Sequence, residues 1–297
     1  MHSNKLRYQY KYLDLNLSSN IAIDLIDQIS SSAHYDVSFD VLDVIRDTYK
    51  YHKKTLILES SKVKVVIYKK DLGIFSLENG KKITFNPFYD YDPLVLSNTI
   101  LNLVYGFVLY QRGQNVLHTS AVELDGKAVL FVGPSGSGKS SLASLFSKHG
   151  RFITEDLGVL RKDSQNKISI QKTLPIIKLE NSENEQIGVL PDDSRNRNLY
   201  YSNNPVKNEF TEISYIYFMK WGNTIELSLP TIKDLIYNFQ ISLFSSFPFN
   251  SCKDSSKQAL NLISDLEKNI RIRICSRSKG NSLEETYQLL KADLKCH

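Results

Sequence analysis

A short stretch of the sequence has the residue types and the spacing of a phosphate-binding loop. From Gly133 to Ser140 it matches the pattern Gly-x-x-x-x-Gly-Lys-Ser/Thr at every fixed position. Glycines let the backbone curl so that successive N–H groups point at phosphate oxygens, and a following helix adds the positive end of its dipole. We expect the Lys139 ammonium to meet the β and γ phosphates and the Ser140 hydroxyl to bind Mg2+. The predicted nucleotide-binding residues are Gly133, Pro134, Ser135, Gly136, Ser137, Gly138, Lys139, Ser140 and Ser141.

Two acids follow the loop unusually early. Glu155 and Asp156 end a strand-like run that begins at Phe152, with only a predicted helix from Ser140 to Lys148 and a turn at Gly150 in between. Strand ends in a parallel sheet open onto the crevice beside such a loop, so we expect Asp156 near Mg2+ and the γ phosphate. A carboxylate there can accept the proton of an attacking hydroxyl or bind the metal. The plainer alternative is a residue that caps a turn.

Three basic or titratable residues elsewhere are weaker candidates. His118 lies on a predicted strand before the loop, where a lone histidine is more often structural than catalytic. Arg271 and Arg273 alternate on a predicted strand near the end of the chain. Such a pair can clamp a phosphate through bidentate hydrogen bonds, but alternating basic residues more often face solvent.

The elements around the loop are those that the motif requires. A buried strand from Ala128 to Val132 comes directly before it, and a helix comes directly after it. From Val116 onward, strand patterns alternate with helical ones, which is typical of an α/β domain. We expect one strand from Val116 to Leu124 in this order. The polar segment from Asn181 to Asn208 is expected to be a long loop, acting as a substrate lid or simply disordered.

The rest of the chain suggests a second kind of domain. Before residue 94 the sequence is rich in alternating and β-branched runs, including Ile21 to Leu25. We therefore predict a β-rich N-terminal domain over residues 1–93, a connecting helix over 94–113, and an α/β phosphate-loop kinase domain over 114–297.

The composition excludes several classes of protein. The 297 residues are 41% hydrophobic and 23% charged, and the net charge of +5 is scattered, which predicts a globular protein that binds no nucleic acid. The most apolar stretch, Leu94 to Tyr110, contains too many polar residues for a membrane span. Three cysteines lie far apart without metal-ligand spacing, so a reducing compartment, the cytoplasm, is expected.

The region from Val116 to Leu160 resembles the catalytic core of the HPr serine kinase/phosphorylase family, which is similar in fold to phosphoenolpyruvate carboxykinase. The shared features are a histidine on the strand before the loop, the loop itself and the early acidic pair. By this resemblance, His118 matches the active-site histidine and Lys139 the loop lysine. Ser140 matches the Mg2+ ligand, and Asp156 matches the acid that takes the proton of the substrate serine.

The sequence departs from that family in several places. Ser141 stands where the regulatory kinase usually has Glu, and Glu155 replaces the first Asp of the acidic pair. The Glu-Ile-Arg-Gly-Leu-Gly signature is absent, although Glu180 lies at about the right distance to supply its metal contact. With these departures the chain looks more like the HPr-kinase-like proteins of lasso-peptide biosynthesis.

The resemblance implies a peptide kinase that uses ATP and Mg2+. Its substrate is expected to be a ribosomal precursor peptide, phosphorylated on a hydroxyl, commonly that of a C-terminal serine. Two alternatives remain open: a kinase/phosphorylase acting on a folded carrier protein, and a nucleotide-binding module without catalysis. Relatives of the family assemble into oligomers, so a homo-oligomer is a further possibility.

Overall fold

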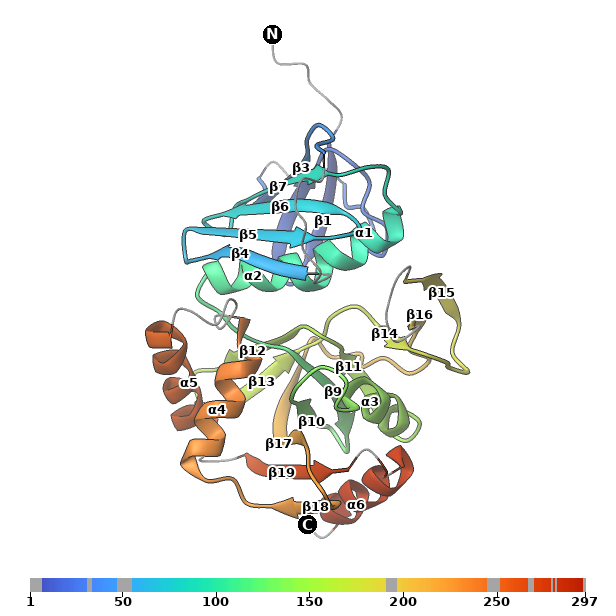
Figure 1. Cartoon of the computed structure of the whole chain (residues 1–297), viewed down its shortest axis with the longest axis vertical. Coiled ribbons are helices and arrows are strands. Elements are labelled where there is room, and N and C mark those ends of the chain that lie inside the picture. The colour runs from blue at the N-terminus through green and yellow to red at the C-terminus, as the bar shows by residue number, and fades with distance from the viewer. Residues whose placement is uncertain are drawn as a thin grey trace. The chain divides into compact units, whose positions relative to one another are not determined.

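The chain forms two compact units, shown in a computed structural model (Figure 1). Residues 7–30, 34–46, 55–190, 197–244, 252–266, 270–278, 280 and 282–295 are described. The first unit lies within Met1–Gln114, and the second lies within Asn115–Ser246 and Ser251–His297. The expected fold class, a mixed α/β protein, is confirmed.

The described residues of the first unit form a seven-stranded sheet in the order β1-β2-β3-β7-β6-β5-β4. Alternation along its strands buries one face, because successive side chains point to opposite sides. Phe75 and Phe85 stack within that core, with ring centroids 4.4 Å apart. The strands are β1 (Tyr8–Tyr12), β2 (Leu15–Ser19), β3 (Val37–Val41), β4 (Thr55–Ser60), β5 (Lys64–Lys69), β6 (Gly73–Glu78) and β7 (Lys82–Pro87).

The predicted strand from Ile21 to Leu25 is wrong. This segment is irregular, and its Ile23 N–H donates to the Tyr10 hydroxyl at 2.8 Å instead of joining the sheet. Leu25 has a positive φ of 67°, which an extended strand does not allow.

The expected connecting helix is part of the first unit. It runs through α1 (Pro93–Thr99), a π-helical turn η1 (Ile100–Val104) and α2 (Tyr105–Gln111), and the Asp92 side chain caps its start. The Gln111 side chain accepts a hydrogen bond from Gly80 N at 2.8 Å, which ties the end of the helix to the β6–β7 turn. Within the described chain, this helix alone is long and apolar enough to cross a membrane, but 72% of its most apolar window is buried. That burial is typical of a core helix.

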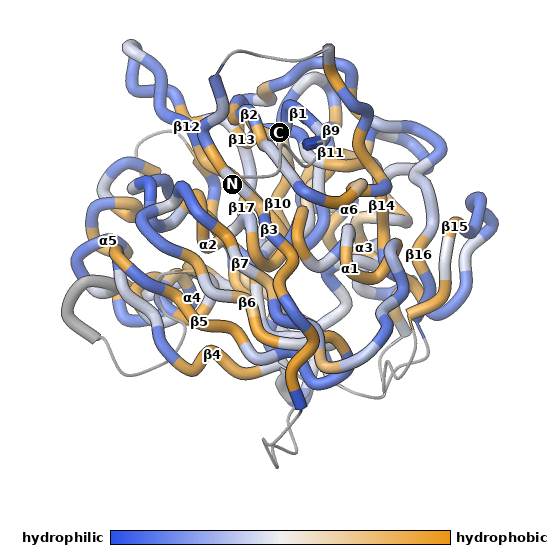
Figure 2. Tube along the Cα trace, turned by 90° about the horizontal axis from the view of Figure 1, so that it is seen from above, coloured by the Kyte–Doolittle hydropathy of each residue, from blue (hydrophilic) through white to orange (hydrophobic). Residues whose placement is uncertain are grey.

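The second unit is built on a nine-stranded sheet with helices on both faces (Figure 1). Figure 2 shows that apolar residues gather along the strands, while many connecting loops are hydrophilic. The strands are β8 (Asn115–Leu117), β9 (Thr119–Leu124), β10 (Lys127–Val132), β11 (Arg151–Thr154), β12 (Gly158–Lys162), β13 (Ile168–Gln171), β17 (Phe210–Trp221), β18 (Glu226–Ser228) and β19 (Arg271–Arg277). The helices are α3 (Lys139–Ser147), α4 (Ile232–Ser242), α5 (Cys252–Leu266) and α6 (Leu283–Lys295).

Alternation along β10 divides the core of this unit into two layers. Leu130 and Val132 face the cluster that contains α4 and α5. Phe131 faces the cluster that contains α3 and α6, and it stacks on Phe146 of α3 at 5.6 Å. The helix that follows the phosphate loop is therefore anchored by its apolar side, which leaves its first turn free to present polar groups.

The antiparallel strand β9 brings the carboxyl ends of β10 and β11 to the same end of the sheet, where the site lies. β9 pairs antiparallel with both β10 and β11, with Thr119 opposite Val132 and Ala121 opposite Thr154. β10 and β11 consequently run in the same direction, and both end where β9 begins. The predicted continuous strand from Val116 to Leu124 is wrong. It is interrupted at His118, which lies between β8 and β9 and whose N–H donates to Ser242 O at 2.7 Å.

A small separate sheet stands beside this edge. It consists of β14 (Ile176–Leu179), β15 (Gln186–Val189) and β16 (Asn198–Tyr201) in the order β14-β16-β15. The segment from Asn181 to Asn208, expected to be a loop, contains two of these strands, although residues 191–196 lie outside the described residues.

Candidate functional site

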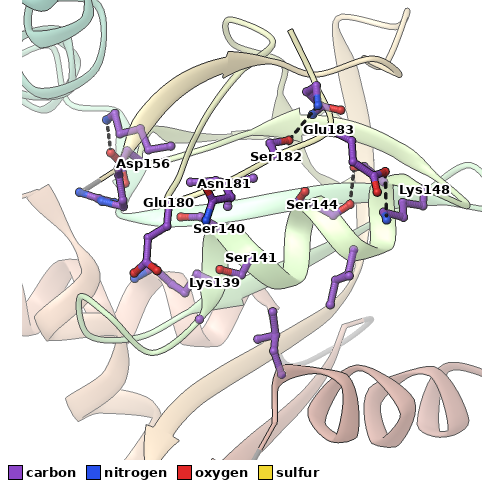
Figure 3. Close-up of a pocket in the computed structure, with 18 of the residues that line it drawn as sticks. Lys139, Ser140, Ser141, Ser144, Lys148, Asp156, Glu180, Asn181, Ser182 and Glu183 are labelled. Atoms are coloured by element: carbon purple, nitrogen blue, oxygen red, sulfur yellow. Dashed lines mark hydrogen bonds and ion pairs between the residues drawn. The ribbon is translucent and has the colours of Figure 1, made fainter. Parts of the chain in front are cut away.

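A cavity of about 1170 Å³ opens at the edge where β10 and β11 end (Figure 3). The phosphate loop and the first turns of α3 form one wall, and the end of β11 with β14 and the residues after it forms another. The sequence places these elements far apart, but the shared strand direction brings them to one edge.

The phosphate loop is folded around its own lysine. Lys139 is only 6% exposed, and its Nζ donates to the carbonyls of Gly133 and Pro134 at 2.9 and 3.0 Å. Gly138 has φ 95° and is the N-cap of α3. Only glycine adopts this conformation without strain, so the loop can turn into the helix with its N–H groups facing the cavity.

Glu155 lies directly against the loop. Ser140 Oγ donates to its Oε1 at 2.5 Å, and Lys178 N donates to its Oε2 at 2.6 Å. Burial and the neighbouring Asp156 charge raise the pKa of Glu155 to about 7. A hydroxyl and a carboxylate are oxygen ligands of the kind that Mg2+ takes from proteins, so these two side chains could bind a metal ion together.

Asp156 makes its side-chain contacts with Lys178 and His118 rather than with the serine. Its Oδ2 accepts from Lys178 Nζ at 2.5 Å, and its Oδ1 lies 3.8 Å from His118 Nδ1. Burial alone raises the pKa of Asp156, but the Lys178 ammonium outweighs it and holds the pKa well below its usual range. Its φ of 65° is a strained conformation for a residue with a side chain, and such strain gathers at functional sites.

His118 completes this group from the break between β8 and β9. Loss of hydration lowers its pKa to about 4, against the pull of Asp156, so the imidazole is neutral at physiological pH. A neutral imidazole can donate or accept one hydrogen bond beside the carboxylate.

The predicted metal contact by Glu180 does not form a cluster with the two acids. Across the described residues, no group of three or more His, Cys, Asp or Glu side chains could hold a metal. Glu180 is exposed and lines the cavity (Figure 3). Mg2+ needs no such cluster, because it usually takes one or two carboxylates and completes its shell with phosphates and water. Ser140, Glu155 and Asp156 fit that requirement.

The two predicted phosphate-binding arginines lie toward the wrong end of their strand. β19 pairs parallel with β17, Arg271 lies opposite Tyr215, and Tyr215 in turn lies opposite Val129, well before the loop. Arg271 Nη1 donates to the Tyr215 hydroxyl at 3.1 Å, and neither Arg271 nor Arg273 lines the cavity.

Arg277, at the other end of β19, is the arginine beside the loop. A Cβ added to Gly138 would meet its Nη1 at 2.8 Å, and its guanidinium lies 5.3 Å from the centre of the Trp221 ring. The position of Arg277 at the carboxyl end of its strand could have pointed to it, since ligands bind at the carboxyl ends of parallel strands.

Lys178 is the second residue that sequence reasoning missed. It is 9% exposed and sits in the apolar strand β14. A charge inside an apolar run needs an ionic partner, which was the available signal.

Comparison with models of protein families finds no match, and comparison with curated proteins finds none. Among solved structures, the chain is similar to the HPr(Ser) kinase/phosphatase from Coxiella burnetii. The identity is 14% and the TM-score is 0.30, over 61% of this chain and 97% of that one. This distant likeness does not establish a family, so the site is interpreted below from its own geometry.

Proposed function

We propose that this chain is an ATP- and Mg2+-dependent kinase that transfers the γ-phosphoryl group to a hydroxyl of a peptide. The observation that carries the proposal is the contact between Ser140 and Glu155 at the mouth of the phosphate loop, with Asp156 beside it in the same cavity. A nucleotide-binding module without catalysis needs the loop, but it does not need a buried acid and a half-buried acid beside it.

The protein groups divide the work between binding and transfer. The loop N–H groups and Lys139 bind the phosphates and stabilise negative charge on the transferred group. Ser140 and Glu155, with Asp156 beside them, would hold Mg2+, which neutralises charge on the phosphate oxygens. Asp156 orients the acceptor hydroxyl and takes its proton as the new O–P bond forms and the bond to the β phosphate breaks. His118, with its Nδ1 3.8 Å from Asp156 Oδ1, lies close enough to act on the charge of the carboxylate.

The cavity has room for a polar acceptor beside the nucleotide. Its volume of about 1170 Å³ exceeds the roughly 300–1,000 Å³ typical of small-molecule sites. Its outer wall carries amide and hydroxyl groups, including Asn181, Ser182 and Asn203, which can hydrogen-bond an extended peptide. The narrower assignment, a lasso-peptide precursor phosphorylated at its C-terminal serine, rests on the resemblance described from the sequence.

Asp156→Asn tests the assignment. The variant keeps the shape of the side chain but removes the proton acceptor, so phosphate transfer to a serine-ended peptide should fall by about 10² to 10⁴-fold. Mass spectrometry of the peptide measures the transfer. Asp265→Asn is the matched control, because Asp265 forms an exposed ion pair with Lys162 at 2.6 Å. Transfer by Asp156→Asn at the wild-type rate would exclude Asp156 as the base.

The same assay separates the alternatives. Faster transfer to a folded carrier protein than to short peptides would replace the peptide kinase with a carrier-protein kinase. Tight ATP binding without a phosphorylated product from either substrate would point to a non-catalytic module.

A further inference from the structure

Lys178 makes two contacts that a merely structural lysine does not need. Its backbone N–H binds Glu155 and its ammonium binds Asp156, so one residue of the small sheet touches both acids. Its side chain is 11% exposed, and the cavity is where it meets solvent. Whatever enters the cavity beside Asp156 therefore also meets this ammonium.

Two buried lysines line the cavity from different elements. Lys139 begins α3 and binds the loop carbonyls, whereas Lys178 comes from β14 and lies against the acids. Both ammonium groups are close enough to act electrostatically on Asp156 and on His118. Lys139 is placed to bind the phosphates nearest the loop. Lys178 is placed to bind a phosphate that extends beyond the loop toward the acids.

The negative charge of Asp156 makes a second cation necessary for a phosphate that lies beside it. A terminal phosphate brought next to the Asp156 carboxylate is repelled by it, and the repulsion is stronger in a partly buried site than in water. The lysine stem is flexible and carries three donors, so its head can leave the carboxylate for a phosphate oxygen, or can contact both.

We infer that Lys178 is a second phosphate-binding lysine, which contacts the terminal phosphate of ATP and so makes the site prefer ATP to ADP. This inference rests on the proposed function only in taking ATP as the ligand. The lysine exchanges part of its bond to Asp156 for the phosphate, which frees the carboxylate to face the acceptor hydroxyl.

The test is the affinity for ATP and for ADP, measured by calorimetry on the full chain in Mg2+-free buffer. Lys178→Gln should weaken ATP binding by about 10- to 100-fold, the worth of one charge-assisted hydrogen bond, and leave ADP binding nearly unchanged. Lys178→Arg should keep most of the preference for ATP. Lys148→Gln is the matched control, since Lys148 lines the same cavity but is 58% exposed and pairs with Glu183 at 3.7 Å.

A double variant separates phosphate contact from screening. Lys178→Gln with Asp156→Asn removes both members of this ion pair, so the protein should fold even if the single variant does not. If Lys178 binds phosphate, the double variant still lacks the preference for ATP. Recovery of the wild-type ratio would show that Lys178 only screens Asp156, and equal loss of ATP and ADP affinity in either variant would show a structural role. Each result overturns the inference.

These measurements do not depend on catalysis. A chain that binds ATP over ADP through Lys178 but phosphorylates no peptide supports the inference and contradicts the proposed kinase. A chain that phosphorylates peptides while Lys178→Gln keeps its preference for ATP does the reverse.

Discussion

The phosphate loop and the acid wall meet at the same cavity but are built in different ways. The acid wall consists of His118, Asp156 and Lys178, which line the cavity, and of the buried Glu155. The loop is a single run of consecutive residues, and its internal hydrogen bonds, such as Ser137 Oγ to Pro134 O at 2.8 Å, span only a few positions. The acid wall draws its groups from the β8–β9 break, the end of β11 and β14. One wall is therefore local, and the other exists only when the whole unit is folded.

This difference predicts different consequences for substitutions. Changes in the loop should affect nucleotide binding first, because the loop holds the phosphates whatever the acceptor is. Changes in the acid wall should affect transfer more than binding, except at Lys178. Variants in each region test whether the loop governs binding and the acid wall governs transfer.

Lys139→Met should have the largest combined effect on ATP binding and phosphate transfer. It keeps the aliphatic stem but removes the ammonium, so ATP affinity and phosphate transfer should both fall, transfer by about 10² to 10³-fold, or about 3–4 kcal/mol. Calorimetry with ATP and the peptide assay measure the two. Asp156→Asn, by comparison, should lose transfer while still binding ATP. If Lys139→Met kept its ATP affinity within a factor of two, the loop would not be the nucleotide site.

Gly133→Ala should have the next largest effect, on folding as well as on binding. The position has φ 151°, and an added Cβ would lie 2.4 Å from the Met219 carbonyl oxygen, so β10 and β17 would have to separate. Strain and overpacking together should cost about 3 kcal/mol of unfolding free energy, measured by urea titration.

Gly126→Ala is the control for this variant. Gly126 also has a positive φ, 77°, but an added Cβ meets nothing within 4 Å, so only the backbone strain remains, about 1 kcal/mol. Equal losses in the two variants would mean that the close approach of the loop to β17 is unimportant.

The loop was predictable from sequence because its chemistry and its geometry lie in the same consecutive residues. The nearness of Glu155 and Asp156 to the loop was also predictable, since strand ends in a parallel sheet meet at one edge. The different roles of the two acids were not predictable. They depend on which carboxylate contacts Ser140 and which contacts the Lys178 ammonium on β14.

The remaining differences arise from long-range pairing. Arg271 and Arg273 were expected at a phosphate, but which end of β19 reaches the loop depends on its parallel pairing with β17, which no local pattern encodes. The role of Lys178 depends on β14 leaving the main sheet for a smaller one. The first unit was predicted as β-rich, but the membership of its helix follows from packing against β6 and β7.

Thr173→Val should have the smallest effect and should act on the acid wall alone. Thr173 Oγ1 forms a hydrogen bond of 2.7 Å with Thr154 Oγ1, and Thr173 N donates to Ile153 O at 3.2 Å, which ties the segment before β14 to the strand that carries the acids. Valine has the same shape without the hydroxyl, so the loss of unfolding free energy should be about 1 kcal/mol. Because the loop is not part of this tie, and Lys178 on β14 is proposed to contact only the terminal phosphate of ATP, ADP affinity should stay unchanged while transfer slows by a few-fold.

Thr99→Val is the matched control for Thr173→Val. Thr99 Oγ1 donates to Val95 O at 2.8 Å in the helix of the first unit, so its loss should have a similar effect on stability without slowing transfer. Slower transfer in Thr173→Val but not in Thr99→Val would show that the position of β14 limits the reaction. A fall in ADP affinity with unchanged transfer in Thr173→Val would reverse the division between the two walls, because the tie between β11 and β14 would then support the phosphate loop.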